Sequence, residues 1–141
     1  MDALEKLLAR FQGPALSLVR FITGLLLLQY GIIKILKFPV IPDGNPAAFL
    51  NKVQMGTLSG TAGLIELILG ALLLVGLFTR PVAFILAGEM AFAYFIGHAG
   101  RSFYPLINGG TLAIAFCFIC LYLSTAGGGP LSLDAILRKK S

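Results

Sequence analysis

The chain has 141 residues, of which 57% are hydrophobic and only 12% are charged, with a formal net charge of +5. A water-soluble domain carries about twice that fraction of charged residues, and a soluble fold of this length cannot bury so much apolar surface. The composition therefore excludes a soluble domain. The basic residues gather at the ends of apolar stretches, where they meet lipid headgroups, so the positive charge does not indicate nucleic-acid binding.

The N-terminal segment is amphipathic. Leu4, Leu7, Leu8 and Phe11 recur at helical spacing, and charged residues occupy the other faces. This pattern predicts a short helix that lies on the membrane surface rather than crossing it.

Four apolar stretches follow, and each is long enough to cross a bilayer. A spanning helix needs roughly 20 apolar residues, and only helices or closed barrels satisfy every backbone group in lipid. The predicted fold is all-α: a four-helix transmembrane bundle with short amphipathic interfacial helices at the termini, forming one integral membrane domain over residues 1–141. The expected spans are residues 15–38, 61–78, 81–98 and 107–125.

The connecting segments predict the topology. Four spans place both termini on one side of the membrane, and an excess of basic residues on that side favours the cytoplasm. That side would carry Lys6, Arg10, Arg80, Arg138, Lys139 and Lys140. The longest loop, residues 37–60, would face outward, with a short interfacial helix expected over residues 47–55. Ser132 is expected to cap a last surface helix.

Polar residues inside the spans are the candidates for function, because an ionisable side chain at membrane depth costs about 3 kcal/mol unless it is paired or wetted. In the first two spans these residues share helix faces with glycines, which let membrane helices approach closely. Lys34 and Glu66 are therefore expected to face each other and form an ion pair. Arg20 lies about one turn inside the opposite end, where it either reaches the headgroups or serves a buried role.

A polar cluster is expected in the outer half of the helices. Its members are Tyr30, Lys34, Glu66, Glu89, Tyr94, His98 and Asn108. Such a cluster forms either a pocket for a small polar or redox-active molecule, such as a quinone head group, or a salt-bridged network that fixes helix register. The number of ionisable groups favours the pocket. Glu89 and His98 lie on opposite faces of their helix, so one of them is expected to face the headgroups or a second protomer, which makes a homodimer plausible.

Three further residues carry weaker patterns. Asn108 is expected to cap the fourth span. Cys117 and Cys120 lie one turn apart, a spacing that can serve dithiol redox chemistry, although a buried cysteine is commonly just a small apolar residue. A metal site is not expected, because His98 is the only histidine in the chain.

Several of these residues resemble, in their order and spacing, the DoxX-like family of small four-helix integral membrane proteins. The matching pieces are Arg20-x3-Gly24-x6-Gly31-x2-Lys34, Glu66-x3-Gly70 with Gly76-Leu77-x-Thr79-Arg80, Asn108-Gly109-Gly110, and Gly127-Gly128-Gly129-Pro130-x-Ser132-Leu133-Asp134. The resemblance implies a bacterial or archaeal cytoplasmic (inner) membrane protein. It also implies an association with quinone-linked oxidation of sulfur compounds, or with redox and thiol-stress complexes. One departure is Thr111, where members often have glutamate.

The resemblance and the polar cluster together predict a redox-linked membrane subunit that binds a quinone and works with a soluble or membrane partner protein. Lys34 and Glu66 would polarise or protonate the head group and Glu89 would relay protons. The binding residues would be Arg20, Tyr30, Tyr94, His98 and Asn108. No nucleotide, haem or iron–sulfur motif is present, so no intrinsic electron-transfer cofactor is expected. The alternatives are a small proton-coupled transporter and a non-catalytic assembly or anchoring subunit.

Overall fold

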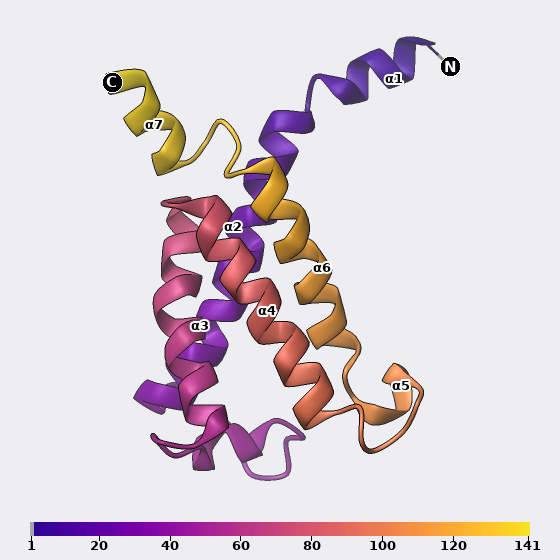
Figure 1. Cartoon of the computed structure of the whole chain (residues 1–141), viewed down its shortest axis with the longest axis vertical. Helices are drawn as coiled ribbons and strands as arrows, with labels where there is room; N and C mark the ends of the chain where they lie inside the picture. The colour runs from indigo at the N-terminus through magenta and orange to yellow at the C-terminus, as the bar shows by residue number, and fades with distance from the viewer. Residues whose placement is uncertain (1) are drawn as a thin grey trace.

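The structure is a computed structural model that describes residues 2–141, and this range is helical with no strand (Figure 1). The α-helices are α1 (Asp2–Ala9), α2 (Gln12–Gly31), α3 (Leu58–Val75), α4 (Thr79–Gly97), α5 (Pro105–Asn108), α6 (Thr111–Ala126) and α7 (Leu133–Lys140). A π-helical turn, η1 (Ile32–Leu36), extends α2, and a 3₁₀ turn, η2 (Ala48–Lys52), lies in the longest loop. The short helix expected in that loop is therefore present as η2.

Among residues 2–141, three segments are long and apolar enough to cross a membrane, namely Gln12–Leu36, Leu58–Val75 and Thr79–Gly97. The fourth apolar helix, α6, has only 16 residues. The expected start of this span at residue 107 was wrong, because Gly109 adopts a left-handed conformation (φ +75°) that ends α5. The next helix then begins at Thr111, and its N-terminus has no side-chain cap. The expectation that Asn108 caps this helix was therefore also wrong.

The long helices pack in two close pairs, α2 with α3 and α4 with α6. Glycines set the approach of the first pair. A Cβ atom on Gly24 would lie 2.4 Å from the backbone nitrogen of Leu74, and one on Gly31 would lie 2.3 Å from that of Leu67. Only a residue without a side chain fits at either position, which confirms the expectation that the small-residue faces are packed inward.

The core between these helices is small and apolar. Leu27, Leu73, Leu86 and Leu123 are almost completely buried in it. Large hydrophobic side chains also cover the outside of the helices, including Phe84, Phe92, Phe95 and Phe118. A soluble monomer rarely exposes so much contiguous apolar surface, whereas lipid tails solvate it.

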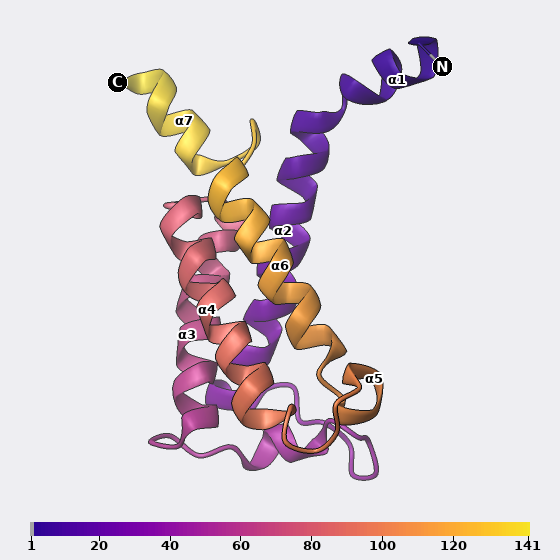
Figure 2. The same ribbon diagram turned by 45° about the vertical axis from the view of Figure 1, so that its right-hand side comes forward.

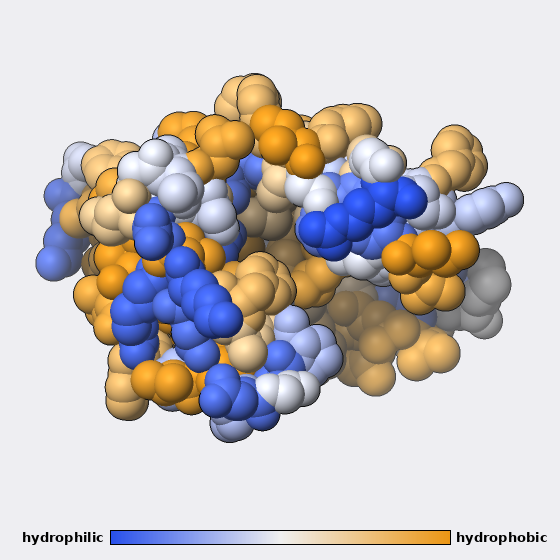
Figure 3. All heavy atoms as spheres, turned by 90° about the horizontal axis from the view of Figure 1, so that it is seen from below, coloured by the Kyte–Doolittle hydropathy of each residue, from blue (hydrophilic) through white to orange (hydrophobic). Residues whose placement is uncertain are grey.

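The two termini lie at the same end of the molecule in both views (Figures 1 and 2). Helix α1 has no buried residue and α7 has none either. The Ser132 hydroxyl accepts a hydrogen bond from the Ala135 N–H at 3.2 Å, which confirms the expected cap of the last helix. The opposite end carries the long loop and α5, and its surface mixes hydrophilic with hydrophobic side chains (Figure 3).

Candidate functional site

The centre of the candidate site is an ion pair between the first and second long helices. Lys34 Nζ lies 2.8 Å from Glu66 Oε2 and 3.0 Å from Oε1, and the two side chains are only 10% and 5% exposed. Glu66 lies on the face of α3 that also carries Gly63. A Cβ atom on Gly63 would lie 2.7 Å from the Cβ of Lys34, so this glycine makes room for the lysine stem. The ion pair expected from the sequence is confirmed.

Lys34 reaches Glu66 from the π-helical turn η1. Turns of this kind are rare, and they occur frequently at functional sites. The following residue, Lys37, has a left-handed backbone (φ 56°) that ends the helix. Its Nζ donates to the carbonyl of Val53, which ties the start of the long loop to its later part. The sequence analysis missed the π turn, because its apolar residues suit an ordinary α-helix equally well.

Tyr30 joins the ion pair from the preceding turn. Lys34 Nζ lies 5.9 Å from the centroid of the Tyr30 ring, within the range of a cation–π contact. Within residues 2–141, no protein group forms a hydrogen bond with the Tyr30 hydroxyl. The ring therefore lies against the ammonium group, and none of the described residues engages its hydroxyl.

Glu89 on α4 adds a second carboxylate to the site. Both of its oxygens are inaccessible to solvent, and neither forms a hydrogen bond with any residue that the structure describes. The carboxylate is close enough to Glu66 and Lys34 to interact electrostatically with both. A buried polar group without a partner is costly, and in native proteins it usually has a catalytic role or a bound water or ligand. Glu89 is the residue in this cluster that packing explains least.

Tyr94, His98 and Asn108 form a separate network at the turn between α4 and α6. Asn108 is buried, and its Nδ2 donates to the Tyr94 hydroxyl at 3.2 Å and to the Ser102 carbonyl at 3.0 Å. Its Oδ1 accepts from the Gly110 N–H at 2.8 Å, and its carbonyl oxygen lies 3.0 Å from His98 Nδ1. These contacts fix the shape of the turn, and they use the whole amide of Asn108 within the protein.

The predicted outer cluster is therefore divided in two. The structure brings Tyr30, Lys34 and Glu66 together, and it places Glu89 within electrostatic range of the ion pair. Among the described residues, no hydrogen bond joins these four to the network around Asn108. One ring nitrogen of His98 is engaged inside its own chain, so this residue gives no support to a second protomer.

Arg20 lies apart from both clusters, toward the end that carries the termini. Its guanidinium is buried and donates only to backbone carbonyls: Nε to Gly128 at 3.1 Å, one terminal nitrogen to Leu73 at 3.0 Å and to Leu74, and the other to Leu131 at 2.6 Å. Of the two roles that the sequence left open, the buried one is observed. Through these hydrogen bonds, Arg20 attaches both the C-terminal tail and the end of α3 to α2.

Comparisons with known proteins identify the family of this chain. Residues 15–99 match the sequence model of the DoxX family. The chain belongs to the DoxX family. An uncharacterized protein from Haemophilus influenzae is 36% identical to it over 143 residues, an alignment that covers 99% of this chain and 100% of the relative. No solved structure shows significant similarity. Family membership and the long apolar helices together make this a membrane protein.

The matched part of the DoxX chain, residues 15–99, includes Arg20, Lys34, Glu66 and Glu89. The turn around Asn108 and the glycine-rich tail lie beyond it. Cys117 and Cys120 also lie beyond it, as free thiols, and Cys120 is part of the apolar core. Cys120 also lies within electrostatic range of Glu89, the buried carboxylate on α4.

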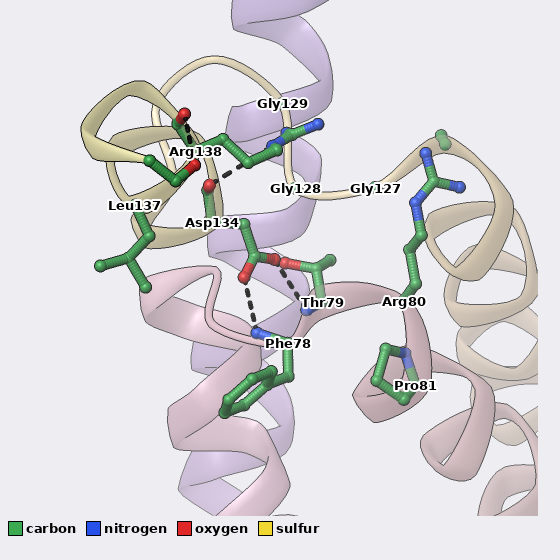
Figure 4. Close-up of a pocket in the computed structure, with 12 residues that line it drawn as sticks. Phe78, Thr79, Arg80, Pro81, Gly127, Gly128, Gly129, Asp134, Leu137 and Arg138 are labelled. Carbon is green, nitrogen blue, oxygen red and sulfur yellow. Dashed lines mark hydrogen bonds between the residues drawn. The ribbon is translucent and has the colours of Figure 1, made fainter.

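A hollow of about 590 Å³ in this DoxX protein lies far from the ion pair, where α4, α7 and the tail after α6 meet (Figure 4). The sequence analysis used several of its lining residues for the topology and the family resemblance, but it gave none of them a binding role. The available clue was the tail itself, because three consecutive glycines at positions 127–129 leave backbone groups open to other side chains. A second hollow, of about 320 Å³, is apolar and lies between α2 and α6.

Proposed function

We propose that this protein is the membrane subunit of a redox-linked system, and that it binds the head group of a quinone or a similar small molecule beside Lys34, Glu66 and Glu89. The observation that carries this proposal is the Glu89 carboxylate, which is buried without a hydrogen-bond partner and lies within electrostatic range of a buried ion pair. Lipid tails form no hydrogen bonds with these groups and do not stabilise their charges. A bound polar ligand that accepts and releases protons would account for the buried Glu89 carboxylate.

The chemistry of these side chains suits a quinone head group. A bound quinone supplies two-electron, two-proton redox chemistry through its two carbonyl oxygens. Lys34 has three N–H donors, and Glu66 occupies two of them, so one remains for a carbonyl oxygen. The Tyr30 hydroxyl is a second donor. Glu89 would hold the proton that passes between the ligand and the outer aqueous phase.

Electron transfer requires a partner protein with its own redox centre. Reduction of a quinone to a quinol consumes two electrons and two protons. The side chains beside Glu89 can hold and move the protons. The electrons would come from the redox partner, soluble or membrane-bound, and the reverse reaction would return them to it.

We place the protein in the cytoplasmic (inner) membrane of a bacterium or archaeon, with α6 as the fourth span of a four-helix bundle and both termini in the cytoplasm. The basic residues of the terminal end support this orientation. Helix α6 is about 24 Å long, slightly shorter than the hydrocarbon layer, and local bilayer thinning accommodates such a difference. The polar cluster would then lie in the outer half of the membrane.

Binding of a short-chain quinone to the purified protein tests the proposal. Glu89→Gln keeps the size of the side chain and removes its proton-exchanging group, and we expect its affinity to fall by about tenfold or more, the loss of one strong charge-assisted hydrogen bond. Glu5→Gln makes the same chemical change on the exposed helix α1, and it should bind as the wild type does. Equal binding by all three proteins, or binding by none, would contradict the proposal.

The transporter alternative gives a different result in the same variants. Proton-driven uptake into vesicles that is lost in Glu89→Gln, in a protein that binds no quinone, would favour transport.

A further inference from the structure

The groove at the terminal end of the molecule is formed by three segments that are far apart in the sequence. They are the first turn of α4, the loop after α6 and helix α7 (Figure 4). The groove encloses about 590 Å³, and none of its lining residues belongs to the site around Glu89. It therefore needs an explanation of its own.

Two arginines reach the groove from opposite walls, Arg80 from α4 and Arg138 from α7. Arg80 donates one hydrogen bond, to the carbonyl of Thr125 at the end of α6. Arg138 donates one, from Nε to the carbonyl of Asp134 in its own helix, at 3.4 Å. Within residues 2–141, the remaining guanidinium N–H groups of both arginines have no protein acceptor, and both side chains are exposed.

Asp134 is the acidic side chain that also lines the groove, and its two oxygens are already occupied. They accept hydrogen bonds from the backbone N–H groups of Phe78 at 2.8 Å and Thr79 at 2.9 Å. Burial alone would raise the pKa of Asp134, but these hydrogen bonds and the nearby Arg138 charge hold it below the ordinary value. The carboxylate thus attaches α7 to the start of α4, and neither it nor that helix terminus is free for a ligand.

The apolar rim and the glycine loop complete the groove. Phe78 and Leu137 are 62% and 53% exposed beside it. Gly127 and Gly129 have left-handed backbones (φ +87° and +77°), and a Cβ atom on Gly128 would lie 2.7 Å from Thr79 Oγ1. The loop therefore runs close to the first turn of α4 without side chains that would fill the groove.

We propose that this groove binds the phosphate of an anionic phospholipid from the adjacent leaflet, held by Arg80 and Arg138 with the acyl chains beside Phe78 and Leu137. Three features argue for a lipid. Two guanidinium groups with free N–H donors complement a phosphate. The groove lies where the spanning helices end. The basic last turn of α7 would favour an anionic leaflet. The inference does not depend on quinone binding.

Delipidated protein titrated with phosphatidylglycerol or phosphatidylcholine, with bound lipid counted by native mass spectrometry, tests this site. We expect a preference for phosphatidylglycerol, and Arg138→Gln should reduce that affinity by about tenfold, the loss of a charge-assisted hydrogen bond to the phosphate. The Arg138 side chain forms its hydrogen bond within its own helix, so the variant should fold normally. Lys139→Gln removes the same charge one residue away, outside the groove, and should weaken binding less, because it loses only the general attraction and no contact with the phosphate.

Arg80→Gln provides a second variant, with the same expected loss of affinity for phosphatidylglycerol. Equal affinity for the two lipids would overturn the proposal. So would an equal loss in Arg138→Gln and Lys139→Gln, because the attraction would then belong to α7 as a whole. Displacement of phosphatidylglycerol by millimolar inorganic phosphate would show that the groove takes a soluble anion, and would overturn the lipid assignment.

Discussion

Lys34 and Glu66 form a buried ion pair, with 2.8 Å between Nζ and Oε2, although they lie 32 positions apart in the chain. Such a pair contributes little net stability, because removing two charges from water offsets most of their attraction. An apolar pair of similar size would serve packing at least as well. We therefore attribute the pair and the unpartnered Glu89 to the proposed ligand site rather than to stability.

Breaking the ion pair should destabilise the protein more than replacing it. Glu66→Gln leaves Lys34 buried without its counter-charge, and we expect the free energy of unfolding to fall by about 3–5 kcal/mol. The double variant Lys34→Met/Glu66→Leu removes both charges and should regain most of this stability. Unfolding in mixed micelles with increasing denaturant measures both changes.

The same double variant separates structure from function. If the pair serves a ligand, the double variant should fold stably and bind no quinone. A stable double variant that binds quinone as the wild type does would exclude Lys34 and Glu66 from the site.

Gly24 controls the approach of α2 to α3. Gly24→Ala would place a Cβ atom 2.4 Å from the backbone of Leu74, so the helices must separate, and we expect a loss of about 3 kcal/mol. Gly88→Ala is the matched control on α4, because nothing lies within 4 Å of the added atom. It should leave stability unchanged or raise it by about 0.5–1 kcal/mol. Equal thermal unfolding of the two variants would contradict the close packing.

Arg20 should hold the C-terminal tail in place. Lysine keeps the charge but cannot reach four carbonyls at once, so Arg20→Lys should cost about 3 kcal/mol and release the tail. Limited proteolysis should then cleave after residue 126 at least ten times faster. Arg101→Lys, an exposed position at the opposite end, serves as the control. Unchanged cleavage in Arg20→Lys would show that the tail is held by other contacts.

The docking of α7 should weaken in acid. Because the pKa of Asp134 is lowered in the folded protein, its contribution is complete above the unfolded value of about 3.9 and disappears as the pH falls through the lower folded value. The amide resonances of Phe78 and Thr79, which donate to this carboxylate, should shift in that acidic range. In Asp134→Asn these shifts should be absent, and their persistence would mean that another group titrates.

The sequence predicted the contacts that depend on helical periodicity. Lys34, Glu66 and the glycines share faces that repeat every few residues, and Ser132 occupies a recognisable cap position. Periodicity could not predict partners that are backbone groups, which is why the carbonyls that bind Arg20 and the N–H groups that bind Asp134 were missed. The sequence assigned Asn108 as the cap of the fourth span, because the glycines that follow it can precede a helix. In the structure, Gly109 instead ends the short helix α5. The division of the outer cluster depends on the path of the turn after α4, which has no repeating pattern.

The most direct test is a native mass spectrum of the protein extracted gently from its own membrane, compared with that of Glu89→Gln. We predict that the wild type retains an adduct with the mass of a quinone and that the variant loses it. An anionic phospholipid on the groove between Arg80 and Arg138 should remain in both spectra, since that site is separate. A wild-type protein that carries phospholipid alone would contradict the assignment of a quinone site to Lys34, Glu66 and Glu89.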